Sequence, residues 1–197
     1  AEIVLDEAQN GIRFESFKCV ALGSHLEKTS RDIDEFLKIS IVITESLNAL
    51  HEAKIFIDSM NLDNVLICDR FLWAKFISFS YAKDSNESLP DKNSNYLALG
   101  GLFYEMATQK RPIRFEDGSV EAIFQEQEIP LPIQHIIQKL LSKFPKNRYQ
   151  SLDGLISDLK NCMVQFQKTA SIQYFFPGQK DLKTSNLLTE YLYRRSS

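Results

Sequence analysis

A polar loop and a later serine carry the side chains that could do chemistry. Asp58 and Ser59 stand near the start of the loop, and Asn64 stands at its end. An ionised Asp58 could act as a general base or be a solvated turn carboxylate, and Asn64 could contact a phosphate or hold the loop's own backbone. Ser59 and Ser78 offer hydroxyls, which are not bases at neutral pH. As nucleophiles they would need a base that the sequence does not place beside them.

The composition indicates one packed domain with a tail. The chain has 197 residues, 44% of them hydrophobic, and its net charge of −3 provides no basic surface of the kind that binds nucleic acid. No apolar run approaches the roughly 20 residues of a membrane-spanning helix, so we expect a cytoplasmic protein without a membrane partner. The first residue is not Met, which leads us to expect a piece of a longer protein.

The cysteines and histidines show no metal-ligand spacing. The cysteines lie far apart without a C-x-x-C pair, which favours a reducing interior over a disulfide framework; they are Cys19, Cys68 and Cys162. The histidines form no ligand cluster, and we expect structural roles for all three, which are His25, His51 and His135. We therefore assign no residue to a metal.

The hydrophobic pattern predicts a mainly α fold with one small sheet. Helical periodicity covers residues 14–26, 33–50, 96–108, 120–127, 133–143 and 152–166. Residues 30–32 offer an N-terminal cap for the helix at residues 33–50. Short β-branched runs predict strands at residues 3–5, 65–67 and 74–77, the last two forming a hairpin. The strand at residues 3–5 is expected to need partner strands from outside this sequence. The polar residues 83–95 are expected to form a loop. Gly100 and Gly101 would let another backbone approach the apolar helix closely.

Several segments, in this order, resemble a protein kinase. Residues 33–51 are similar to the long helix before the catalytic loop, residues 96–106 (YLALGGLFYEM) to a buried helix, and Arg148 to an arginine between the last two helices. The resemblance implies a kinase C-terminal lobe over residues 12–166, preceded at residues 1–11 by the last strand of the N-terminal lobe and the hinge. In the family the hinge contacts adenine and an Asn binds metal, so the nucleotide-binding candidates are Asp6, Glu7, Ala8 and Asn64.

The reactive groups of the family are altered. A kinase reads H-R-D-x-x-x-x-N and then D-F-G, where one Asp accepts the substrate's proton and the Asn and second Asp hold metal ions. With Asn64 at the metal-binding Asn, Ser59 occupies the catalytic Asp position and Asp58 lies one residue early. Ser78 replaces the metal-binding Asp. Asp58 is thus the remaining candidate base, and ATP with Mg²⁺ would bind, if at all, without the Asp that anchors the metal.

The scaffold positions of the family are altered as well. Asn61 stands where the family has a loop lysine, and Asn95 stands where an Asp normally braces the catalytic loop. Residues 82–95 are too few for an ordinary activation segment. This loss is expected to leave Arg148 without its usual carboxylate partner.

The end of the lobe is similar to kinase-like domains that precede an AAA-type ATPase module. Residues 136–143 and 148–151 carry this likeness, and residues 176–178 (FPG), Asp181 and residues 192–195 (LYRR) follow in the same order. Many members of that group are hybrid sensor histidine kinases. The resemblance therefore implies a parent protein that acts in two-component signalling.

Three functions stay open at this point. The resemblance favours a regulatory pseudokinase module, whose partners are the AAA-type ATPase, sensor and histidine kinase modules of the same chain, reached through a linker at residues 167–197. An atypical Ser/Thr kinase that uses Asp58 and Asn64 is the alternative, and a helical adaptor is the third. Exposed aromatic residues mark interfaces, so we expect Phe175 and Phe176 to dock on a neighbouring domain and Trp73 to pack in the core.

Overall fold

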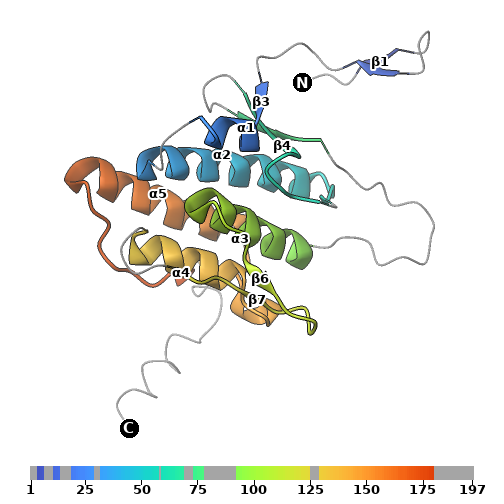
Figure 1. Cartoon of the computed structure of the whole chain (residues 1–197). Coiled ribbons are helices and arrows are strands. Elements are labelled where there is room, and N and C mark those ends of the chain that lie inside the picture. Colours follow the sequence, from blue (N-terminus) through green and yellow to red (C-terminus); the bar gives the residue numbers. More distant parts are fainter. Residues whose placement is uncertain are drawn as a thin grey trace.

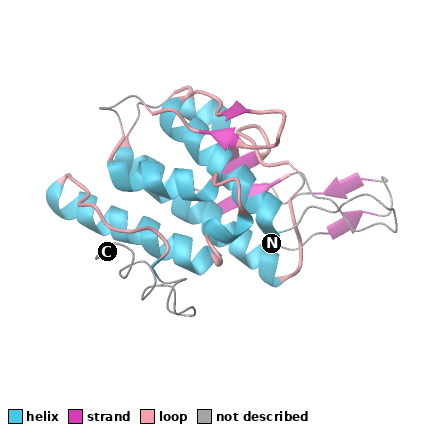
Figure 2. Cartoon of the chain, turned by 90° about the horizontal axis from the view of Figure 1, so that it is seen from below, coloured by secondary structure: helices cyan, strands magenta, loops and turns pink. Residues whose placement is uncertain are grey.

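The structure is a computed structural model in which helices form most of the described chain (Figure 2). The helices are α1 (Leu22–Leu26), α2 (Ile33–Glu52), α3 (Lys92–Thr108), α4 (Leu131–Leu140) and α5 (Leu152–Thr169), with a 3-10 turn, η2, at Pro145–Asn147. The residues that the structure describes are 4–6, 11–13, 19–28, 32–57, 59–68, 73–77, 92–124 and 129–179.

The strands are short and pair antiparallel. They are β1 (Val4–Asp6), β2 (Gly11–Arg13), β3 (Cys19–Ala21), β4 (Val65–Cys68), β5 (Trp73–Phe76), β6 (Ile113–Arg114) and β7 (Val120–Glu121). β1 pairs with β2, β6 pairs with β7, and a three-stranded sheet has the order β3-β4-β5. A mainly helical fold with small antiparallel sheets is therefore confirmed.

The central helix α2 organises the body. Its N-cap is Asp32, whose side chain accepts a hydrogen bond from the Asp34 backbone N–H at 3.0 Å, as the expected cap requires. One face of α2 lies against α5 and another against β5, while α3 packs on α4 (Figure 1). Ser46 on α2 accepts a hydrogen bond from the Ala74 backbone N–H at 3.4 Å, which links the helix to the sheet. Burial on both sides explains why a helix with so many β-branched residues is stable.

The contact of α3 with α4 depends on one glycine. A Cβ atom at Gly100 would lie 2.8 Å from Cβ of Leu140, so a neighbouring helix does approach closely there, although its nearest atoms belong to side chains rather than to the backbone. At Gly101 the nearest neighbour would be Pro112 at 3.9 Å, and no such approach exists. α3 begins at Lys92 rather than Tyr96, because the polar residues assigned to a loop form its first turn.

Three expectations about local structure were wrong. The periodic segment 14–26 is not one helix, because Cys19–Ala21 pairs with β4 and only Leu22–Leu26 is helical in the part described. The segment 120–127 begins as a strand, because a turn at Gly118, with φ of 75°, returns the chain onto β6. β1 finds its partner within the chain, in β2, although we expected it to need strands from outside.

The expectation about the cysteines was also wrong. Cys19 and Cys68 stand opposite each other in β3 and β4 and are joined by a disulfide, and Cys162 is free and buried. Their separation of 49 residues hid a pairing that only the strand register creates. In the described part of the chain, none of the helices is long and apolar enough to cross a membrane.

Candidate functional site

One side chain of α3, that of Asn95, holds the loop that follows α2 through hydrogen bonds. Asn95 is 1% exposed, and its Oδ1 accepts the Ile57 backbone N–H at 3.0 Å. Its Nδ2 donates to the Ile57 carbonyl at 2.6 Å. The Asn95 amide thus forms hydrogen bonds with both the N–H and the carbonyl of one loop residue. Asn95 stands at the position where the kinase resemblance places a bracing Asp.

His51, at the end of α2, completes this brace. Because Asn95 Oδ1 is an acceptor, His51 Nε2 must donate to it across their 3.0 Å separation. Burial lowers the pKa of His51, the Asn95 hydrogen bond raises it, and the nearby Lys92 ammonium lowers it, for a net decrease. The imidazole ring packs beside Phe56 and Tyr96. A structural role was expected, and this geometry gives the neutral ring such a role.

The second half of the loop is held by Asn61. Its Oδ1 accepts the backbone N–H groups of Asp63 at 2.9 Å and Asn64 at 3.0 Å, and its Nδ2 donates to Ser59 Oγ at 3.2 Å. The Asn64 carbonyl accepts the Ile77 backbone N–H at 3.1 Å, which fixes the loop to the residue after β5. Ser59 is exposed, and Asn64 is half-buried. The side chain of Asn61 thus holds the loop backbone, a role that the sequence analysis had considered for Asn64.

The other candidate residues are placed only in part. Asp58 and Ser78 lie outside the described residues, as do Glu7 and Ala8 of the expected hinge. Asp6 is the last residue of β1 and pairs in register with Gly11 of β2. The structure therefore describes Ser59 and Asn64, both of which contact Asn61, in the loop that Asn95 holds at Ile57.

Two further residues that bear on this loop were missed by the sequence analysis, one by a direct hydrogen bond and one by its charge. The Gly23 backbone N–H of α1 donates to the Leu62 carbonyl at 2.9 Å. Burial raises the pKa of Glu105 on α3, with a smaller raising effect from the Asp63 carboxylate, while Arg111 and Arg114 lower it, for a net increase. A carboxylate that follows the apolar run in the second half of α3 was the signal that could have identified Glu105.

Arg148 forms a buried anchor below α3. It is 7% exposed and donates to the carbonyls of Ser142 at 2.8 Å, Asn93 at 2.8 Å and Lys143 at 3.4 Å. These backbone partners satisfy a guanidinium that we expected to lack its carboxylate. The arginine thereby joins the start of α3 to the segment after α4.

The Phe-Pro-Gly segment folds back onto the lobe. Asp158 Oδ2 on α5 accepts the Gly178 backbone N–H at 2.6 Å and the Tyr149 hydroxyl at 2.8 Å. Phe175 packs against the core of this chain, and Phe176 is 47% exposed. Phe175 thus has a partner in its own core, whereas docking of either phenylalanine on a neighbouring domain stays a prediction.

Trp73 is the aromatic residue that was expected to pack in the core. Trp73 is half-buried at the start of β5, with the Lys75 ammonium 4.6 Å from the centre of one of its rings, so it lies at the border of the core.

Among the described residues, no group of three or more His, Cys, Asp or Glu side chains could hold a metal ion.

Comparison with known proteins found two kinase relatives, although no family model matches the chain. It is similar to a "Probable serine/threonine-protein kinase" of Clostridium acetobutylicum, with 23% identity over 164 residues that cover 66% of this chain and 25% of that protein. It is also similar to "Hybrid signal transduction histidine kinase G" of Dictyostelium discoideum, with 34% identity over 87 residues that cover 38% of this chain and 2% of that protein. The chain thus spans a small part of both proteins. Together the two similarities support a distant, kinase-like relationship for this chain.

Proposed function

We propose that this chain is a pseudokinase lobe that regulates a larger signalling protein and does not itself transfer phosphate. The observation that carries the proposal is the loop after α2, which Asn95 and His51 brace and which exposes the Ser59 hydroxyl. The kinase resemblance assigns Ser59 to the position of the catalytic Asp. The Ser59 hydroxyl accepts a hydrogen bond from Asn61 Nδ2, but it does not take a proton from a substrate at neutral pH.

The electrostatics of the loop support the same proposal. The brace consists of a neutral amide and a histidine whose pKa is lowered, so it adds no negative charge beneath the loop. Phosphoryl transfer depends on carboxylates that hold Mg²⁺ against the phosphates. Ser78, which replaces one of these carboxylates in the sequence, adds to this argument.

We further propose that the parent protein is a cytoplasmic hybrid sensor histidine kinase. Similarity to a hybrid signal transduction histidine kinase supports this, as does the order of the Phe-Pro-Gly turn and the residues that follow it. The partners would then be an AAA-type ATPase and the sensor and histidine kinase modules of the same chain. A P-loop, G-x-x-x-x-G-K-[ST], encoded shortly beyond Ser197 would agree with this parent, and its absence would favour a helical adaptor.

The alternative is an atypical Ser/Thr kinase that uses Asp58 as base and Asn64 at the metal. The observation in its favour is that the similarity covering most of this chain is to a probable serine/threonine-protein kinase.

Phosphate transfer by the full-length protein separates the two functions. The pseudokinase proposal expects no saturable, magnesium-dependent ATP binding to this lobe by calorimetry and equal transfer by wild type and D58N. The kinase alternative expects D58N to lose about a hundredfold or more of its transfer rate. S59A is compared with S24A, which changes an exposed serine of α1. Loss of transfer in S59A with S24A unchanged would contradict the proposal.

A further inference from the structure

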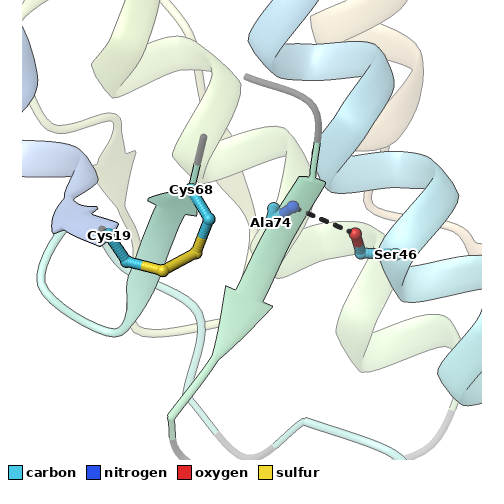
Figure 3. The surroundings of a disulfide bond; sticks show 4 residues. All are labelled: Cys19, Ser46, Cys68 and Ala74. Atoms are coloured by element: carbon cyan, nitrogen blue, oxygen red, sulfur yellow. Dashed lines mark hydrogen bonds between the residues drawn. A yellow bond between two sulfur atoms is a disulfide. The ribbon is translucent and has the colours of Figure 1, made fainter. Parts of the chain in front are cut away.

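Cys19 and Cys68 join the edge of the sheet to its central strand. Cys19 is the first residue of β3 and Cys68 the last residue of β4, and they are direct partners in register with Cα atoms 4.1 Å apart (Figure 3). Cross-strand partners this close belong to the non-hydrogen-bonded kind, in which side chains approach most nearly. The strand pairing itself therefore brings the two sulfur atoms together.

β3 depends on this bond more than the other strands of the sheet do. It has three residues, it lies at the edge of the order β3-β4-β5, and its central Val20 is 49% exposed. So short an edge strand has few ladder hydrogen bonds and little burial to stabilise it. The disulfide is the covalent part of its attachment.

The same segment contacts the candidate loop at its other end. Two residues after β3, the Gly23 N–H donates to the Leu62 carbonyl, and a Cβ atom at Gly23 would lie 3.4 Å from both Leu62 and Asp63. The segment from Cys19 to Gly23 thus spans β4, with a disulfide at the end of that strand and a hydrogen bond at the loop that leads into it. A change at the sulfur pair can reach the loop through this one short segment.

The two sulfur atoms differ in access. Cys19 is half-buried and Cys68 is 0% exposed, so a thiolate from solution reaches the Cys19 sulfur first. Attack forms a mixed disulfide at Cys19 and releases Cys68 as a thiolate, which takes up a proton. A second thiol then releases Cys19, so that two reductant thiols are oxidised to one disulfide and two protein thiols form.

We propose that the Cys19–Cys68 pair is a thiol-sensitive clamp that, when oxidised, holds β3 and α1 against β4 and the loop at residues 59–64. Reduction frees β3 from the edge of the sheet and weakens the Gly23 hydrogen bond to the loop. In a reducing compartment such pairs are typically transient and redox-sensing rather than permanent. The clamp requires neither nucleotide nor phosphate transfer, so it is tested separately from the regulatory role proposed above.

The first test is chemical and uses the full-length protein. After equilibration with oxidised or reduced glutathione, free thiols are alkylated and the peptides are mapped by mass spectrometry. We expect a Cys19–Cys68 linked peptide in oxidised glutathione and two alkylated cysteines in millimolar reduced glutathione. Absence of the linked peptide, or its persistence in reduced glutathione, would overturn the clamp.

The second test measures the loop contact. Hydrogen exchange of the Gly23 amide is expected to become about tenfold faster on reduction, which corresponds to about 1.4 kcal/mol of lost protection. In C19S the amide should exchange fast in both buffers, and C19A provides a second variant at this half-buried position. C162A is the matched control, because Cys162 lies on α5 and burial raises its pKa to about 12, which keeps it a thiol. Equal exchange of the Gly23 amide in oxidised and reduced glutathione would rule out the clamp.

Discussion

Asn95 does with an amide what a carboxylate cannot do. It accepts from the Ile57 N–H and from His51, and it donates to the Ile57 carbonyl. A carboxylate has acceptors only, so it would leave that carbonyl without its donor and place a negative oxygen against it. The amide is therefore matched to this loop, and the departure from the kinase pattern is not a simple loss.

Replacing Asn95 with Asp tests this match. We expect N95D to lower the free energy of unfolding by about 1–3 kcal/mol, the cost of a buried polar group left unpaired. Urea unfolding near neutral pH measures it. The control is N161D at an exposed position of α5, where the side-chain oxygen still accepts from Gln165. Equal stability of N95D and wild type would show that the carbonyl does not need the donor.

His51 predicts a pH dependence of stability. Its pKa is lowered in the folded protein, chiefly by burial, so the unfolded chain binds a proton more readily. The contribution of His51 to the free energy of unfolding is then fully present above the ordinary histidine pKa of about 6.5. It is lost as the pH falls below that value. The slope of stability against pH in this window should therefore be positive.

The variant H51Q removes the titrating group but keeps an N–H donor for Asn95. We expect wild type to lose more stability than H51Q between about pH 8 and pH 5.5, with the urea midpoint as the measurement. The offset between the two proteins at the higher pH serves as the internal reference. Parallel curves would mean that His51 titrates alike in the folded and unfolded states.

At the scale of elements, the long helices and the hairpin of β4 and β5 could be predicted, whereas β3 could not. α2 and α5 carry apolar residues at helical spacing and begin at capping side chains, Asp32 and Ser151, so local sequence contains their signal. β3 is defined by its partner β4, far away in the sequence, and its residues fit a helical period equally well. Of the candidate site, the bracing position Asn95 was found from resemblance, whereas the contacts of Asn61 and Gly23 depend on the loop's folded path.

The glycine pair in α3 provides a matched test of helix packing. In G100A the new methyl group would lie 2.8 Å from Leu140 and 3.0 Å from Leu141, so α3 and α4 must separate. We expect a loss of about 1–3 kcal/mol from overpacking, despite the better helix propensity of alanine.

G101A is the control for that change, since its methyl group meets Pro112 at 3.9 Å, an ordinary contact. It should gain up to about 1 kcal/mol from helix propensity. Thermal unfolding of the two variants under identical conditions compares them. A stabilised G100A would mean that α3 and α4 do not approach as closely as the structure has them.

For the whole molecule, the Phe-Pro-Gly segment determines how the lobe ends. Asp158 holds the Gly178 N–H and the Tyr149 hydroxyl on one oxygen, so the last described segment is fixed to α5. Gly178 has a φ of 81° and lies where a Cβ atom would be 2.5 Å from Lys139, which restricts this position to glycine. The described chain is therefore attached to α5 as far as Gly178.

Changing Asp158 to Asn tests that attachment. The two donors cannot both be satisfied as well by a neutral amide, since hydrogen bonds to a charged acceptor are stronger and the new NH₂ group needs an acceptor of its own. We expect D158N to lower the free energy of unfolding by about 1–3 kcal/mol and to speed proteolytic cleavage between Ile172 and Gln179. D153N, at an exposed carboxylate in the first turn of the same helix, is the control and should lose well under 1 kcal/mol. Faster cleavage in D158N alone would establish that the Asp158 carboxylate holds the Phe-Pro-Gly segment on α5. Equal cleavage in both variants would assign that role to the packing of Phe175 on the core.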